Sequence, residues 1–132
     1  MVLILHFKLI FIAFSMILLF KVSLGQSPEE VFHGCMEETG VPTEIIHKII
    51  NHDSGFDDQR GKCFEKCICI GLGLCDANDG KLIPEMFIKM KPYLSADKLS
   101  EELPKCNEIN GTDICDSIHQ RYICFYERIP KP

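Results

Sequence analysis

The chain has 132 residues, with 14 lysines and arginines against 19 aspartates and glutamates, and a formal net charge of −5. This acidic balance argues against nucleic acid and against an anionic membrane surface as partners. Eight cysteines in so short a chain indicate an oxidising, extracellular compartment, where disulfides can support a small core.

The first 25 residues are expected to be a secretory signal peptide that is removed. The segment is almost wholly apolar and ends in Ser23 and Gly25, small residues at positions −3 and −1 of a cleavage site before Gln26. A membrane anchor is the alternative, because the apolar run is long enough to span a bilayer. Cleavage would leave one domain, residues 26–132, whose 107 residues carry 12 basic and 19 acidic side chains, a formal charge of −7.

The mature chain is predicted to form six short helices and no strand. The first follows the cap residue Ser27 and ends at Gly40. A second runs over about 44–51, and a central helix covers about 57–72, with Gly73 placed to end it. The fold class is therefore all-α.

The second half of the chain contributes three of these helices. The fourth begins at Pro84, the fifth is capped by Ser95 and is expected to kink or end at Pro104, and the last follows Asp113 and ends at Pro130. Each predicted helix is near or below the length at which an isolated helix is marginal. Packing and disulfides must therefore hold the helices together.

Six cysteines are spaced as Cys35-x27-Cys63-x3-Cys67-x38-Cys106-x8-Cys115-x8-Cys124. Cys63 and Cys67 lie one turn apart on one face of the central helix, where they are poorly placed to bond each other and well placed to tether two other segments. Cys115 and Cys124 fall on opposite sides of the last helix and must reach different partners. Spacing alone still leaves 15 connectivities for six cysteines.

This spacing, in a secreted, acidic, all-helical chain, resembles the insect odorant-binding protein family of pheromone and general odorant carriers. The resemblance covers the whole mature chain, and the three-residue gap and the two eight-residue gaps are its specific parts. It implies a compact bundle of about six helices around an apolar cavity. It also implies three interlocked bridges, Cys35–Cys67, Cys63–Cys115 and Cys106–Cys124.

The resemblance implies a secreted carrier that reversibly binds small hydrophobic molecules, such as odorants or pheromones, and transports them through extracellular fluid. Its partners would be a small lipophilic ligand and, as a candidate, a chemoreceptor. No cofactor, metal or stable membrane association is expected, and the chain would be a monomer or a weak homodimer. A secreted effector or scavenger on the same scaffold, in venom, saliva or reproductive fluid, is the alternative, because a fold does not determine a role.

Two cysteines depart from the six-cysteine pattern. Cys69 lies about 200° around the helix from Cys67, and Cys75 follows the reversal at 71–73. A local Cys69–Cys75 bridge is slightly favoured over two buried thiols, because an even cysteine count in a secreted protein favours pairing. A zinc site formed by Cys63, Cys67, Cys69 and Cys75 is a third hypothesis. The oxidising compartment and the absence of CxxC spacing argue against it.

A carrier needs an apolar cavity and a rigid wall rather than a catalytic group. His119 is expected to hydrogen-bond a ligand carbonyl or hydroxyl and to change that bond as pH falls. Ordinary core packing is the alternative for the apolar candidates, and a locally satisfied or exposed side chain is the alternative for His119. The predicted wall comprises Phe64, Ile68, Leu72, Met86, Phe87, Met90, Leu103, Ile118, His119, Tyr122 and Phe125.

Other chemistry in the sequence is limited. His52 and Asp53 are adjacent, as a secreted phospholipase would require, but no cysteine lies near them as that enzyme's signature demands, and no hydrolase motif is present. Catalysis is therefore not expected, and His52 is placed on the surface with His33 and His47. Asn110 begins an N-glycosylation sequon in a predicted surface turn.

Overall fold

The structure is a computed structural model that describes residues 2–23 and 25–129, with side chains described for 2–13 and 25–129. The all-α prediction is confirmed, and the one β contact in the described ranges is an isolated antiparallel bridge between Cys75 and Leu82. The helices found in these residues are α1 (Val2–Ser23), α2 (Pro28–Thr39), α3 (Thr43–Ile50), α4 (Gln59–Gly71), α5 (Pro84–Met90), α6 (Ala96–Cys106) and α7 (Ile114–Arg128).

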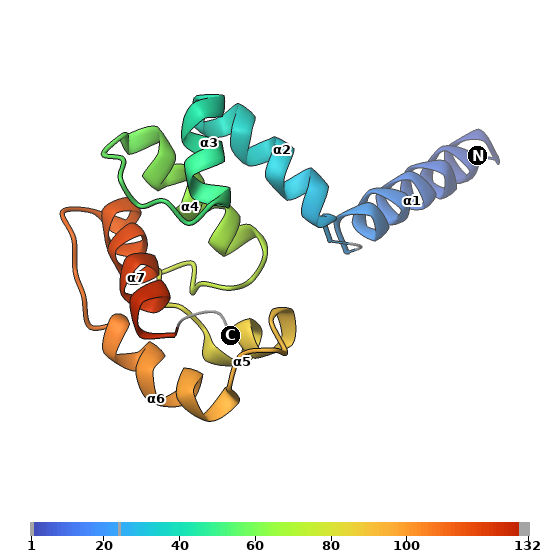
Figure 1. Cartoon of the computed structure of the whole chain (residues 1–132). Helices are drawn as coiled ribbons and strands as arrows, with labels where there is room; N and C mark the ends of the chain where they lie inside the picture. The colour runs from blue at the N-terminus through green and yellow to red at the C-terminus, as the bar shows by residue number, and fades with distance from the viewer. Residues whose placement is uncertain (1, 24, 130–132) are drawn as a thin grey trace.

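The bundle is organised around α4 and α7, which make the most extensive helix–helix contact. Helices α2 and α3 also pack on α4. Helix α6 packs on α7, and α5 packs on α6. Figure 1 shows α4 crossing the molecule between the α2–α3 pair and the α5–α6 pair. The helix that carries three cysteines, Cys63, Cys67 and Cys69, is therefore central in space as well as in sequence.

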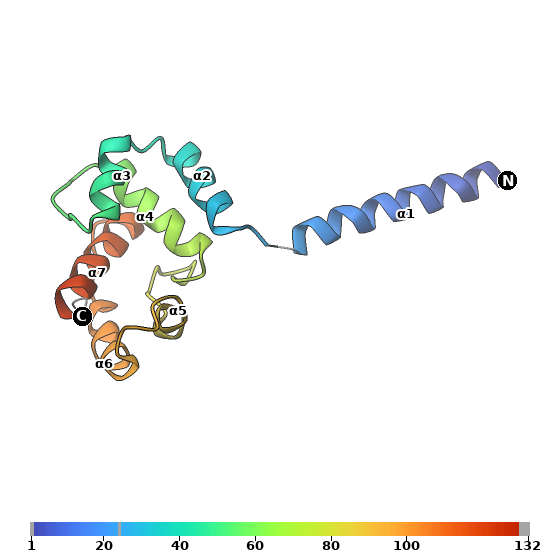
Figure 2. The same cartoon turned by 45° about the vertical axis from the view of Figure 1, so that its right-hand side comes forward.

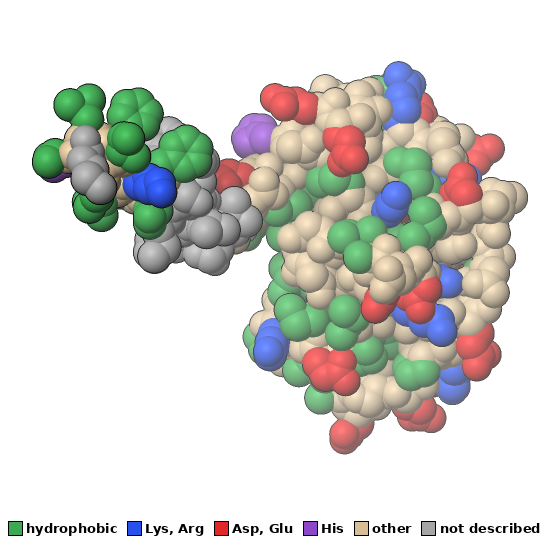
Figure 3. Space-filling view, turned by 180° about the vertical axis from the view of Figure 1, so that it is seen from behind, with side chains coloured by type: hydrophobic (Ala, Val, Ile, Leu, Met, Phe, Trp, Pro, Cys, Tyr) green, Lys and Arg blue, Asp and Glu red, His purple; other side chains and the backbone are tan. Residues whose placement is uncertain are grey.

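The first helix stands apart from this bundle. Figure 2 shows α1 extending away from it along a straight path, and among the described residues α1 packs against no other helix. In residues 2–13, where its side chains are described, the large apolar side chains are exposed, for example Leu3 at 82% and Phe11 at 76%. Figure 3 shows hydrophobic side chains on the surface of this part of the helix. Nowhere in the described residues is a helix both long and apolar enough to cross a membrane.

The predicted capping residues Ser27 and Ser95 begin α2 and α6 as expected. The Ser27 hydroxyl accepts a hydrogen bond from the backbone N–H of Glu30, and Asp58, Ser95 and Asp113 cap α4, α6 and α7 in the same way. Each cap satisfies one of the backbone donors that a helix N-terminus leaves unpaired. Gly40 ends α2 with φ of 62°, a conformation that glycine adopts without strain.

The helix was expected to kink or end at Pro104, and it does not end there: α6 continues to Cys106. The proline lies in the last turn, where the loss of one backbone donor removes only one hydrogen bond, and Asn107 closes the helix by donating its N–H to Leu103. The expected end of the last helix at Pro130 lies outside the described residues; α7 itself ends at Arg128.

Buried polar side chains fix the loops to the helices. Arg121, which is only 2% exposed, donates to the Ile109 carbonyl at 3.0 Å, the Asp79 carbonyl at 2.8 Å and Asn110 Oδ1 at 3.3 Å. Burial lowers the pKa of this guanidinium from its usual value. The three hydrogen bonds hold the α4–α5 loop and the α6–α7 loop against α7. Asn110 itself is exposed, and its glycosylation stays a prediction.

A second polar contact joins the two central helices. Lys62 on α4 lies 3.0 Å from Asp116 on α7, and the side chains of both are mostly buried. The Thr112 backbone N–H and Lys62 hold the pKa of Asp116 down at about 2. Gly111 lies against the same carboxylate, so closely that a Cβ there would overlap it. This turn therefore requires glycine for space.

Candidate functional site

Three disulfides join helices of the bundle to one another, and a fourth closes a local loop. Cys35–Cys67 ties α2 to α4, Cys63–Cys115 ties α4 to α7, and Cys106–Cys124 ties α6 to α7, the pairs that the family resemblance implies. Cys69 is bonded to Cys75, which closes the loop after α4. Because all eight cysteines are used, the described chain contains no free thiol, and the readings with two free thiols or a four-cysteine zinc site do not agree with the structure.

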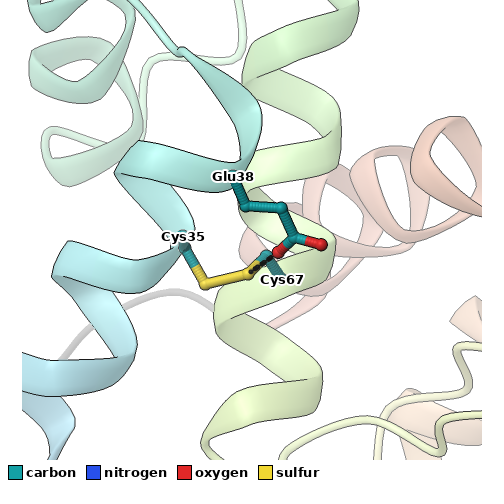
Figure 4. A group of neighbouring side chains, drawn as sticks. All are labelled: Cys35, Glu38 and Cys67. Atoms are coloured by element: carbon teal, nitrogen blue, oxygen red, sulfur yellow. Dashed lines mark hydrogen bonds between the residues drawn. A yellow bond between two sulfur atoms is a disulfide. The ribbon is translucent and has the colours of Figure 1, made fainter.

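One cluster of potential metal ligands occurs in the described part of the chain, namely Cys35, Glu38 and Cys67 (Figure 4). Glu38 Oε2 lies 3.0 Å from Cys67 Sγ. Both sulfurs are already bonded to each other, so neither is a thiolate that could coordinate a metal. The cluster is therefore a carboxylate beside a disulfide, not a metal site.

A cavity of about 240 Å³, partly open to solvent, lies between α2, α3, α4, α5 and α7. Its polar residues are His52, Asp53, Ser54, Glu65, Lys91, His119, Tyr122 and Tyr126. Such a mostly apolar, concave site with a few polar groups is typical of small-molecule binding. The apolar side chains that form most of its wall are Phe32, Ile49, Ile50, Phe64, Ile68, Leu74, Phe87, Met90 and Ile123.

Six of the predicted wall residues line this cavity, and five do not. Those that line it are Phe64, Ile68, Phe87, Met90, His119 and Tyr122. The residues placed elsewhere belong to the core or pack against it, because they lie on other faces of their helices or beyond the α4 end: Leu72, Met86, Leu103, Ile118 and Phe125. Leu103 and Ile118, for example, are 0% exposed.

His119 is buried at the cavity wall and pairs with an acid. Its Nδ1 lies 3.0 Å from Oε2 of Glu65 on α4, with side chains that are 6% and 10% exposed. The ring of Phe56 packs on the imidazole at 4.7 Å. His119 therefore lines the cavity, and its Nδ1 already has a local partner in Glu65, as the alternative of a locally satisfied side chain proposed. A hydrogen bond from His119 to a ligand stays a prediction.

Two tyrosines continue the polar side of the cavity along α7. The rings of Tyr122 and Tyr126 stack with centroids 6.0 Å apart. Burial raises the pKa of Tyr122, and it raises the pKa of Tyr126 to about 12. The negative charge of Glu65 adds to both shifts, so both hydroxyls remain protonated hydrogen-bond donors at physiological pH.

The prediction that His52 lies on the surface is wrong, because its side chain is half-buried at the cavity wall. It follows α3 with φ of 56°, and this left-handed turn brings its ring to 4.2 Å from the ring of Tyr126, at the cavity wall. His33 and His47 are exposed as expected. Lys91 also reaches Tyr126, with Nζ 5.7 Å from the ring centroid.

Two residues of the cavity wall could have been predicted from their helical spacing but were not. Tyr126 lies four residues after Tyr122, and Glu65 lies three residues before Ile68, so each shares a helix face with a residue that was identified. Lys91 and the 52–54 turn carry no such pattern, because they lie outside regular helix. Only the folded chain brings them to the cavity.

Comparison with known proteins agrees with this architecture. Two of the similar solved structures are a fatty acid binding protein, OBP56a, from the oral disk of the blowfly Phormia regina, and the odorant-binding protein OBP28a of Drosophila melanogaster. The first has 25% identity and a TM-score of 0.64 over 76% of this chain and 87% of its own; the second has 26% and 0.59 over 76% and 88%.

A third similar structure, the odorant-binding protein OBP1 of Locusta migratoria, is 24% identical with a TM-score of 0.59, over 80% of this chain and 84% of its own, and shows the fold alone. Comparison with curated protein sequences found no match. The PBP/GOBP family model, however, matches residues 20–128. With the helical bundle, its disulfides and its cavity, this match shows that the chain belongs to the PBP/GOBP family, the family of the insect odorant-binding proteins.

Proposed function

We propose that this protein is a secreted carrier that takes up small hydrophobic molecules in the cavity beside α7 and moves them through extracellular fluid. The observation that carries the proposal is the cavity itself, about 240 Å³ with a mostly apolar wall. Members of the family bind small hydrophobic ligands and are not enzymes, and the fatty-acid binding named for the blowfly neighbour supports a lipophilic ligand here. An odorant or pheromone is the proposed class of ligand.

The proposal includes removal of residues 1–25. The described part of α1 exposes large apolar side chains and packs against no helix of the bundle, so the bundle does not need it. Cleavage after Gly25 would release a domain of residues 26–132. Mass spectrometry of the secreted protein should find Gln26 as the first residue; a retained apolar segment would contradict this.

Titration of the oxidised, delipidated protein with a polarity-sensitive lipophilic fluorophore tests the carrier function. We expect about one probe to bind per chain and to be displaced by some small apolar compounds but not by others. Absence of binding, in a sample that is helical and has all four disulfides, would overturn the carrier proposal. The protein would then act through its surface, as an effector on the same scaffold.

A pair of matched variants locates the binding site. Ile68 and Ile70 lie two residues apart on α4, but only Ile68 lines the cavity. Ile68→Trp should fill part of the cavity and weaken binding of the fluorophore at least tenfold, whereas Ile70→Trp should leave it unchanged. Equal effects of the two substitutions would place the ligand elsewhere.

A chemoreceptor is the proposed protein partner, and a monomer or weak homodimer is the proposed state. Sedimentation of the mature protein, with and without ligand, measures the second directly. A stable dimer at micromolar concentration would contradict it.

A further inference from the structure

The polar side of the cavity follows one face of α7. His119, Tyr122 and Tyr126 are spaced three and four residues apart, which places them on the same side of a helix, and all three line the cavity. The rise of the helix separates the first from the last by roughly 10 Å. A ligand lying along this face would therefore meet these side chains in order.

The two tyrosine hydroxyls are available to a ligand. In the described part of the chain, no hydrogen bond joins either hydroxyl to another residue, although both side chains line the cavity. Neither hydroxyl oxygen is among the fully buried polar atoms without a partner in the described residues, so both are reached from the partly open cavity. An oxygen atom of the ligand could accept the hydrogen bond that each hydroxyl otherwise gives to water.

The carboxylate of Glu65 disfavours an anion at the two tyrosines. Burial is the main cause that raises the pKa of Tyr122 and Tyr126, and Glu65, which pairs with His119 at 3.0 Å, adds to both shifts, so its field opposes a negative charge on either phenol oxygen. The same field would oppose a ligand carboxylate placed at those hydroxyls. A neutral oxygen acceptor experiences no such penalty.

The competing arrangement places an anion at the other end of the face. Lys91 lies over the Tyr126 ring, with Nζ 5.7 Å from the centroid, and it also lines the cavity. A fatty acid could direct its carboxylate to this lysine and its chain inward. The exposed carboxylate of Asp53 lines the same cavity and opposes this arrangement.

We propose that the cavity selects uncharged ligands with one oxygen acceptor, such as a ketone, ester or aldehyde, that it binds this oxygen through the Tyr122 hydroxyl, and that it discriminates against a carboxylate of the same length. This inference rests on the carrier function proposed above and specifies the ligand class of the same cavity.

Displacement of the fluorophore at pH 7.5 by octane, 2-octanone and octanoate tests the selectivity. Octanoate should bind at least tenfold more weakly than 2-octanone. Tyr122→Phe should weaken 2-octanone three- to tenfold, the equivalent of one ordinary hydrogen bond, and leave octane unchanged. Tyr93, which is 55% exposed and does not line the cavity, supplies the matched control: Tyr93→Phe should change none of the three.

The role of Glu65 has its own variant. Glu65→Gln keeps a hydrogen-bonding group beside His119 but removes the charge, and it should reduce the gap between octanoate and 2-octanone at least threefold. The selectivity proposal is wrong if the parent protein binds octanoate as tightly as 2-octanone, or if Tyr122→Phe weakens octane and 2-octanone equally. It is also wrong if the parent binds octanoate tightly and Lys91→Gln abolishes that binding, because the carboxylate would then lie at the lysine. Failure of all three compounds and of the fluorophore to bind would instead contradict the carrier function.

Discussion

Lengthening a straight-chain ligand one methylene at a time measures the size of the cavity. Each buried methylene contributes about 0.8 kcal/mol, which corresponds to about a fourfold gain in affinity. The cavity holds about 240 Å³, enough for about eight non-hydrogen atoms at the 30 Å³ that a water occupies in the liquid. Packing as dense as a protein interior would raise this to about eleven.

The assay is displacement of the fluorophore by 2-alkanones from six to fourteen carbons. Affinity should rise about fourfold per methylene up to a ligand of about eight to eleven non-hydrogen atoms, and then stop rising or fall, because further methylenes stay in water. Ile68→Trp should move the break to shorter chains, and Ile70→Trp should not. A fourfold gain that continues to fourteen carbons would show that the ligand lies in a longer site than this cavity, and the reasoning would be refuted.

Three further predictions concern stability. The pKa of Asp116 is lowered from 3.8 to about 2, which implies about 2 kcal/mol of stability that is present above pH 4 and is lost as pH falls toward 2. In urea unfolding, Asp116→Asn should remove this pH dependence of the free energy of unfolding, and an unchanged pH profile would contradict the prediction. Arg121→Met should destabilise by about 3 kcal/mol, because it leaves the Ile109 and Asp79 carbonyls without their donor; a change below 1 kcal/mol in the same measurement would refute this. Replacing Cys69 and Cys75 by alanine should cost about 2 kcal/mol, the least of the four bridges because only six positions separate them; a loss larger than that for the Cys63–Cys115 pair would be inconsistent.

The cavity shows where helix-face reasoning succeeds. Tyr122 and His119 lie on one side of the last helix, and the structure brings both to the cavity. Phe125, three residues after Tyr122, belongs instead to the core, with its ring 5.1 Å from that of Phe87. Both faces of α7 are apolar enough to be buried, so periodicity could not tell which one borders empty space.

Local chemistry in the sequence determined where four of the helices begin. Ser27, Asp58, Ser95 and Asp113 each offer an oxygen acceptor that satisfies donors within three residues, so no distant contact is needed to choose those positions. The cysteine spacing, through its family resemblance, likewise pointed to the fold and to three of the bridges.

Only the tertiary structure decided what those helices enclose. The Glu65–His119 contact joins residues 54 positions apart, and the place of His52 depends on a turn whose φ of 56° the sequence does not signal. Cavity volume is a small difference between the space that the helices surround and the side chains that fill it. It therefore depends on packing between distant segments, which no local pattern contains.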